Sequence, residues 1–478
     1  MLFNSLLFIG FFVLVYAVYL RLNRWYKAQN VLLLIAGYVF YGWWDWRFLA
    51  LIAAVTIVNF RAGNAISRTD DLRKRQIHLI SALVLSLSGL GFFKYFNFFA
   101  DSAIAMLNLV GIKLDSVTLN IILPIGISFY TFQALTYPLD LYFGRLRQPS
   151  GLLEFATFTS FFPQLLAGPI ERATNMLPQF GRRRTITADN INVALYLILW
   201  GYFKKIVIAD NAALIANRIF DNYTQYRGLD LLVGVLAFAI QIYCDFSGYS
   251  DIARGLAKLM GFELMVNFKL PYLATNLADF WRRWHISLTS WFRDYLWWNM
   301  VKKIPMTGTV GAQVRWNAAL VAVFLISGLW HGAAYNYILW GGFHGVLLVI
   351  YGLYNGRRIR AGQGTSKVWW RRGTAMAVTF CCVSAGWVFF RAGSLGQIAG
   401  MLKGICLWSS PSALDSAAKL LFFSIPLIIM ELWQHFRRNM LAPLQWPALA
   451  RAFIYSLLLI WIFVFRPHAP TEFLYFQF

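Results

Sequence analysis

Residues Leu236–Phe262 read LAFAIQIYCDFSGYSDIARGLAKLMGF, and this stretch combines two opposing properties. Its first half belongs to an apolar run over 229–247 that is long enough for a membrane helix, which needs about 20 apolar residues. Asp245 and Asp251 nevertheless interrupt the stretch, together with Gln241 and Ser247. Polar groups at membrane depth cost free energy unless they are paired or functional. The stretch therefore predicts a membrane helix that also carries functional residues.

Apolar runs recur along all 478 residues, of which 13% are charged, against roughly 25% in a soluble protein. Several runs are shorter than a full span, so we expect some to be tilted, buried or re-entrant. The pattern predicts an all-α, polytopic integral membrane protein with about 11–13 membrane segments, in which 1–478 form a single domain. The first run is expected to be a span and not a cleaved signal peptide. The runs are 3–20, 30–42, 47–60, 78–100, 119–142, 187–208, 229–247, 315–329, 336–354, 373–390, 418–434 and 449–466.

The net charge of +23 could suggest a nucleic-acid partner, but the basic residues lie in short stretches between the apolar runs. Such clusters are typical of the cytoplasmic loops of membrane proteins, so we expect no nucleic-acid partner. With Met1 outside, the loop 355–372 falls on the cytoplasmic side and the tail 466–478 on the outer side. Re-entrant segments account for the odd crossings in this topology.

The two aspartates of the opening stretch have different expected roles. Asp251 and Arg254 lie three residues apart, so they can pair on one helix face. Asp245 lies deeper in the apolar run and has no obvious local partner. For Asp245, the sequence leaves a structural and a functional role equally open.

The segment Phe280–Trp298, FWRRWHISLTSWFRDYLWW, is amphipathic when it is drawn as a helix. Arg282, Arg283 and Arg293 fall with the other polar residues in an arc of about 140°. We expect a helix at the membrane interface, with its tryptophans among the lipid headgroups and its arginines towards water or phosphate. His285 lies outside the polar arc, and structural and functional roles for it remain open alternatives.

The segment Ser327–Gly345, SGLWHGAAYNYILWGGFHG, contains two histidines in an apolar, glycine-rich run. His331 and His344 are thirteen residues apart, about 140° around a helix, so they share no face and predict no metal site. The four cysteines also lack metal-ligand spacing. An intramembrane histidine is a candidate general base because its ordinary pKa lies near working pH. His331 is therefore a catalytic candidate, with a packing role as the alternative.

A series of motifs along nearly the whole chain resembles the membrane-bound O-acyltransferase superfamily. They are YGWWDW (41–46), LGFFKYFNFF (90–99), LPIGISFYTFQALTYPLDLY (123–142), FFPQLLAGPIER (161–172), Phe280–Tyr295, GLWHG (328–332) and GWVFFRA (386–392). The similarity is to the bacterial branch that contains alginate O-acetyltransferases and the D-alanine transfer protein of teichoic acids.

This resemblance implies a ring of tilted helices around a thin centre, with a tunnel between the two membrane faces. His331 matches the catalytic histidine of the family's WHG motif, and His285 matches the supporting histidine of WRRWH. His344 has no firm match and is expected to pack. Acetyl-CoA is the implied donor, bound from the cytoplasm, with its phosphates drawn to arginines such as Arg282, Arg283 and Arg293.

The resemblance also implies an O-acetyltransferase of the bacterial inner membrane, surrounded by membrane lipids and without a permanently bound cofactor or metal. The acetyl group would reach an alginate-like exopolysaccharide, cellulose or peptidoglycan through a periplasmic transferase that resembles SGNH hydrolases. Some relatives depend on a small protein ending in F-x-Y-x-x-F, whose tyrosine is thought to receive the acyl group. This chain itself ends FLYFQF (473–478), so Tyr475 is a predicted acyl carrier. An aromatic anchor at the interface is the alternative.

Two other classes of protein fit part of the pattern. A proton-coupled transporter would use intramembrane Asp245, His285 and His331 with broken helices, although the sequence contains no inverted repeat. A structural scaffold of a polysaccharide export complex would leave the histidines unexplained.

Overall fold

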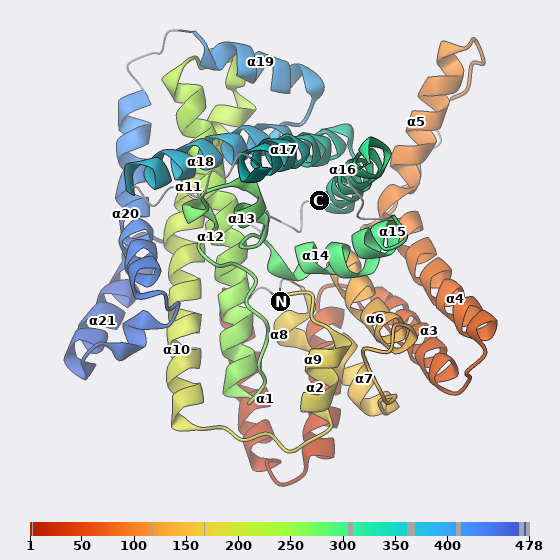
Figure 1. Ribbon diagram of the computed structural model, residues 1–478. Coiled ribbons are helices and arrows are strands. Elements are labelled where there is room, and N and C mark those ends of the chain that lie inside the picture. The colour runs from red at the N-terminus through yellow and green to blue at the C-terminus, as the bar shows by residue number, and fades with distance from the viewer. Residues whose placement is uncertain are drawn as a thin grey trace. The chain divides into compact units, whose positions relative to one another are not determined.

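The computed structural model describes residues 1, 3–115, 118–166, 168–304, 309–360, 369–407, 413–467 and 473–474, without the side chains of 357–360. All its elements are helices, and these residues contain no strand (Figure 1). The chain divides into two compact units: unit 1 is Met1–Ile198 with Tyr249–Met265, and unit 2 is Leu199–Gly248 with Val266–Phe478. The division falls within α10 (Ala188–Tyr202) and α12 (Leu229–Leu259), which contribute to both units.

The described residues confirm the predicted all-α, multi-pass membrane class. Eight helices or helix runs are long and apolar enough to cross a membrane, and two shorter apolar helices accompany them. By contrast, α6 (Ile127–Tyr142) is short and buried along nearly its whole length, so part of the run 119–142 belongs to the protein interior. The eight are Trp46–Ser67, Leu72–Leu109, Ala188–Asp221, Leu229–Leu259, Val310–His331, Tyr335–Gly356, Trp369–Arg391 and Ala413–Arg437; the shorter two are Leu6–Arg21 and Ala448–Val464.

In unit 1 the buried α6 packs against α3 (Leu49–Ser67), α4 (Leu72–Leu90), α7 (Leu152–Thr159) and α9 (Ala173–Phe180). Glycine permits a close backbone contact here, because a Cβ on Gly37 of α2 (Tyr26–Gly42) would lie 2.0 Å from the carbonyl oxygen of Ser160. A buried arginine, Arg184, donates to Tyr19, Gln29 and Asn30 and fixes the start of the unit. The remaining helices are α1 (Leu6–Arg21), α5 (Phe96–Leu109) and α8 (Phe162–Leu165).

Unit 2 holds the three segments that the sequence singled out. Two of its helices continue as π-helices, η3 (Phe203–Ala209) after α10 and η6 (Phe292–Trp297) after α14. Its helices are α11 (Asp210–Asp221), α13 (Leu277–Trp281), α14 (Ile286–Trp291), α15 (Trp298–Val301), α16 (Val310–His331), α17 (Tyr335–Arg360), α18 (Trp369–Arg391), α19 (Leu395–Ile405), α20 (Ala413–Arg437) and α21 (Ala448–Val464).

The segment Phe280–Trp298 differs from the single interfacial helix that its periodicity predicts. The helix is interrupted between α13 and α14, where His285 takes a left-handed φ of 42°. Trp281, Trp284 and Trp291 are buried in the protein and do not lie among lipid headgroups. The apolar face is therefore covered by protein, which amphipathic periodicity cannot distinguish from lipid.

The hairpin of α16 and α17 positions His331, the last residue of α16 (Figure 1). A Cβ on Gly328 would lie 2.1 Å from the carbonyl oxygen of Tyr337, and one on Gly341 would lie 2.1 Å from that of Phe324. The two backbones touch here because neither residue has a side chain, as is common where membrane helices pack.

We predict that Gly328→Ala destabilises the hairpin by about 1–3 kcal/mol, because the added methyl group must push α17 away. The thermal unfolding midpoint in detergent should fall. Gly352→Ala, on the same hairpin, is the matched control, since nothing lies within 4 Å of its Cβ position. Equal midpoints for the two variants would contradict the close helix contact.

Candidate active site

The structure brings His285 and His331 together in unit 2. Their ring centroids lie 6.4 Å apart, and both side chains are less than 5% exposed. His331 ends α16, whereas His285 occupies the turn before α14. The two histidines that the sequence placed in separate motifs thus form one buried pair.

Asn267 holds the turn that carries His285. Its Oδ1 lies 3.2 Å from Nδ1 of His285 and accepts hydrogen bonds from Ser287, at 3.2 Å from the backbone N–H and 2.8 Å from the hydroxyl. Its backbone carbonyl accepts the N–H of Ile286 at 2.9 Å. A left-handed backbone costs a non-glycine residue roughly 1–2 kcal/mol, and these bonds offset that cost.

Aromatic rings surround the histidine pair. The ring of His331 lies edge-on to Trp330 and Trp340, each at 5.0 Å, and to Phe390 at 5.3 Å. Phe246 packs perpendicular to His285 at 4.6 Å. Such an environment has a low dielectric constant, which strengthens any polar interaction made inside it.

His344 lies away from a polar environment and packs as expected. It is fully buried, with Trp281 at 5.1 Å and Trp340 at 5.2 Å. A Cβ on Gly386 would lie 2.5 Å from its Nε2, so α18 approaches the ring closely. Neither ring nitrogen has a hydrogen-bond partner among the described residues.

Asp245 has partners that are distant in sequence. Its Oδ1 lies 2.7 Å from Nζ of Lys205 in η3, and the same Nζ lies 2.8 Å from Oδ1 of Asp210. All three side chains are at most 3% exposed. The other oxygen, Oδ2, accepts the backbone N–H of Leu474 at 2.7 Å. A buried ion cluster therefore holds a residue close to the end of the chain.

Phe473 and Leu474 reach the same part of unit 2, where the ring of Phe246 lies between Phe473 and His285. Phe473 and Leu474 are buried, and the ring of Phe473 packs 5.7 Å from Phe246, whose ring contacts His285. Tyr475, the predicted acyl carrier, lies outside the described residues.

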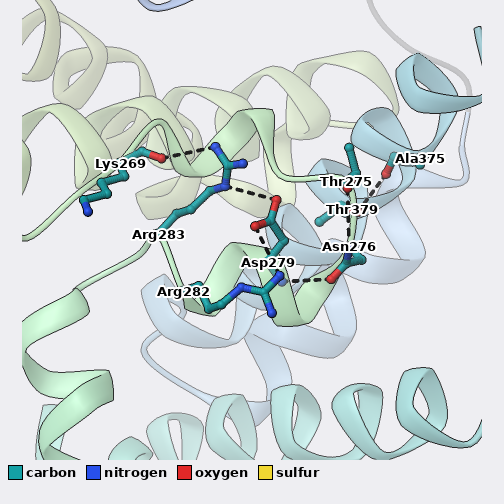
Figure 2. A network of polar contacts seen from close by, with 8 residues as sticks. All are labelled: Lys269, Thr275, Asn276, Asp279, Arg282, Arg283, Ala375 and Thr379. Atoms are coloured by element: carbon teal, nitrogen blue, oxygen red, sulfur yellow. Dashed lines mark hydrogen bonds and ion pairs between the residues drawn. The ribbon is translucent and has the colours of Figure 1, made fainter. Parts of the chain in front are cut away.

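The three predicted donor-binding arginines each pair with a carboxylate. Figure 2 shows Asp279 between Arg283, 3.0 Å from its Nε, and Arg282, at 3.4 Å. Arg293 pairs with Asp294 at 2.8 Å. The side chains of Arg282 and Arg293 remain more than 60% exposed, and those two acids leave one positive charge in excess.

The predicted pair Asp251–Arg254 is confirmed, with an N–O distance of 3.0 Å. Among the described residues, no three His, Cys, Asp or Glu side chains are grouped to hold a metal. Sequence reasoning missed Lys205 and Asn267. Two adjacent lysines, 204 and 205, inside an apolar run were a usable signal for the first. Nothing in the local sequence marks Asn267.

The chain also has named relatives. A probable alginate O-acetylase AlgI of Pseudomonas aeruginosa is 40% identical over 401 residues, covering 83% of this chain and 73% of that protein. The peptidoglycan O-acetyltransferase of Helicobacter pylori is 34% identical over 435 residues, covering 85% and 80%. The teichoic acid D-alanyltransferase of Bacillus subtilis is 29% identical over 279 residues, covering 57% and 69%.

A family profile gives the same result. The profile described as MBOAT, membrane-bound O-acyltransferase family, matches residues 43–361. This range includes His285, His331, Asn267 and the Lys205–Asp245 pair. The chain is therefore an acyltransferase and belongs to the membrane-bound O-acyltransferase family.

Proposed function

We propose that the protein moves acetyl groups from cytoplasmic acetyl-CoA across the bacterial inner membrane for O-acetylation of a polysaccharide. The buried pair of His285 and His331 in a multi-pass membrane acyltransferase carries this proposal. Relatives named for alginate and for peptidoglycan support a polysaccharide acceptor, with cellulose as a third candidate. The bacterial sources of those relatives support the inner membrane.

In this proposal His331 is the general base. It takes the proton of an attacking hydroxyl while the oxygen bonds to the thioester carbonyl carbon of acetyl-CoA. The carbon–sulfur bond then breaks, and the proton passes to the departing CoA thiolate. The aromatic surroundings and the burial of His331 support this role, because apolar rings disfavour water, which would otherwise compete as a nucleophile.

His285 plays the supporting role in this proposal, and its hydrogen bonds indicate its protonation. A backbone N–H can only donate, so the Asn267 atom that faces Ser287 N is the amide oxygen. That oxygen can only accept, so Nδ1 of His285 carries the proton and Nε2 keeps its lone pair. Burial lowers the pKa of His285, which lies outside the candidate spans, to about 3. The ring is therefore neutral and suited to orient a hydroxyl.

Arg282, Arg283 and Arg293 are the proposed contacts of the CoA phosphates. The exposure of Arg282 and Arg293 supports this role, since an exposed guanidinium can bind phosphate in a bidentate manner. Arg283 is held by Asp279 and by the carbonyl of Lys269, which suits a fixed contact (Figure 2).

Tyr475 is the proposed acyl carrier on the outer side. A phenol has a pKa of about 10, so it needs a base such as His331 to attack a thioester. The anchoring of Leu474 on Asp245 and the packing of Phe473 against Phe246 support a tail that enters the site. A periplasmic, SGNH-hydrolase-like transferase would then accept the acetyl group and pass it to the glycan.

The transporter and scaffold alternatives receive less support. Asp245, which a proton-coupled carrier would titrate, is paired with Lys205 and bound to the tail. A structural scaffold would not need His285 and His331 as a buried pair surrounded by aromatic rings. Transfer of radiolabel from acetyl-CoA by the purified protein separates the enzyme from both alternatives.

We expect His331→Ala to reduce this label transfer by about 100-fold or more, because the general base is lost. The transfer is measured with purified protein in lipid, and thermal unfolding checks that each variant is folded. His285→Ala should lose less activity, and His78→Ala, on α4 of unit 1, should retain it. Near-normal transfer by folded His331→Ala would contradict the mechanism, whereas no transfer by the wild type would contradict the function.

A carboxylate at position 267 should change how the acetyl-transfer activity depends on pH. In Asn267→Asp the negative charge beside Nδ1 favours the imidazolium form, so the pKa of His285 rises by about one unit or more. Because the neutral ring is the active form, activity should be lost at a higher pH than in the wild type as the solution is acidified. Asn267→Ala adds no charge and should lower kcat without this shift. If the wild type and Asn267→Asp lost activity at the same acidic pH, Asn267 would not position His285.

The proposed carrier role of the tail can be tested by removing the hydroxyl of Tyr475 and, separately, the backbone N–H of Leu474. Tyr475→Phe keeps the ring but removes the nucleophile, so glycan acetylation should be lost at normal protein abundance. Mass spectrometry should find an acetyl adduct on Tyr475 when the downstream transferase is absent. Leu474→Pro removes the N–H that Asp245 accepts and should also abolish acetylation.

Leu474→Ala is the matched control, because it keeps the N–H and loses only side-chain packing. It should retain most of the acetylation. Full activity of Tyr475→Phe would end the carrier role and leave His331 unaffected. Equal activity of the proline and alanine variants would show that the hydrogen bond to Asp245 is not needed.

A further inference from the structure

We propose that unit 2 binds one anionic phospholipid in a groove between α20 and α21. A cavity of about 390 Å³ lies between these helices and η3, and all its lining residues are apolar or aromatic. Phe203, Met430 and Leu458 form a buried floor, whereas Ile429 and Trp433 at the rim are 64% and 40% exposed. The groove is therefore open along its side, and a chain-shaped ligand can enter it laterally.

The surroundings select hydrocarbon as the occupant of the groove. Ala413–Arg437 is a candidate membrane span, and Ala448–Val464 is a shorter apolar helix. Water in such a groove would lose hydrogen bonds, whereas an acyl chain fills it at no polar cost. One acyl chain of a membrane lipid fits these conditions without any change in the protein.

Two arginines mark one end of the groove. Arg437 follows the lining residue Trp433 by one helical turn and lies over its ring, 5.6 Å from the centroid. On α21, Arg451 precedes the lining residues Ile454 and Leu458 by three and seven positions, so it shares their face. A lipid whose chain lies in the groove would thus have its headgroup near both guanidinium groups.

The link between the helices keeps these arginines at the same end. Only residues 438–447 separate α20 from α21, and Arg437 Nη2 lies 3.5 Å from Oε1 of Gln445 in this link. Trp433 and Trp446 also pack together, with ring centroids 6.2 Å apart. Tryptophans are enriched at the level of lipid headgroups, which agrees with a headgroup at this end.

Among the described residues, no carboxylate forms an ion pair with either arginine. No Asp or Glu occurs between residues 432 and 471. Nε of Arg451 is buried without a hydrogen-bond partner in the described part of the chain. The first turn of α21 adds backbone N–H groups that have no intrahelical acceptor. A lipid phosphate would bind to these donors.

Native mass spectrometry of the full protein can test this site. The protein is relipidated with equal phosphatidylglycerol and phosphatidylcholine, and the retained lipids are counted. We expect one retained phosphatidylglycerol, preferred roughly 30-fold, since each arginine near a membrane surface contributes about fivefold. Arg437→Gln with Arg451→Gln should bring the two lipids to nearly equal retention.

Two further variants distinguish the charge from the groove. Arg315→Gln, on the exposed surface of α16, should leave the preference unchanged. Ile429→Trp should fill the groove mouth and reduce retention of both lipids while the arginines remain. If the wild type retained both lipids equally, or if the double variant kept the preference for phosphatidylglycerol, the groove would not be a specific site for an anionic lipid. Complete displacement by inorganic phosphate would show a free-phosphate site and overturn the proposal.

Discussion

The ion pair between Lys205 and Asp245 is the constraint on which the site depends. An unpaired charge buried at this depth costs several kcal/mol, so η3 and α12 cannot separate without exposing a bare charge to an apolar interior. Gly248 permits this approach, because a Cβ there would lie 2.8 Å from the carbonyl oxygen of Gly201. The next residue after Asp245 is Phe246, whose ring packs against His285. The ion pair between Lys205 and Asp245 thus fixes the position of Phe246 beside His285.

The membrane class could be predicted from the sequence, and His285 and His331 could be named as candidates, because hydropathy and short motifs are local properties. The same holds for Asp251 and Arg254, which pair within one helix. The break at His285 could not be predicted in this way. Amphipathic periodicity continues through it, and the residue that holds the turn, Asn267, lies eighteen positions away.

Tertiary partners explain the remaining differences between expectation and structure. Asp245 finds Lys205 forty residues earlier and Leu474 much later in the chain, and no periodic pattern encodes such distances. The tryptophans of α13 and α14 face protein because lipid and a protein core are equally apolar solvents for an indole ring. Sequence reasoning therefore singled out candidate side chains better than it identified the residues that hold them.

The bond between Asp245 and Leu474 also sets an order on biosynthesis. The two residues are 229 positions apart. At a translation rate of about 5–20 residues per second, Leu474 is therefore synthesised roughly 10–50 s after Asp245. During that interval the partly made protein can already insert its membrane helices and pair Asp245 with Lys205. Only a chain translated as far as Leu474 can supply this N–H. Termination before Leu474 would therefore leave an inserted protein in which Asp245 lacks this hydrogen bond, so such a copy would differ at the site from one that contains Leu474.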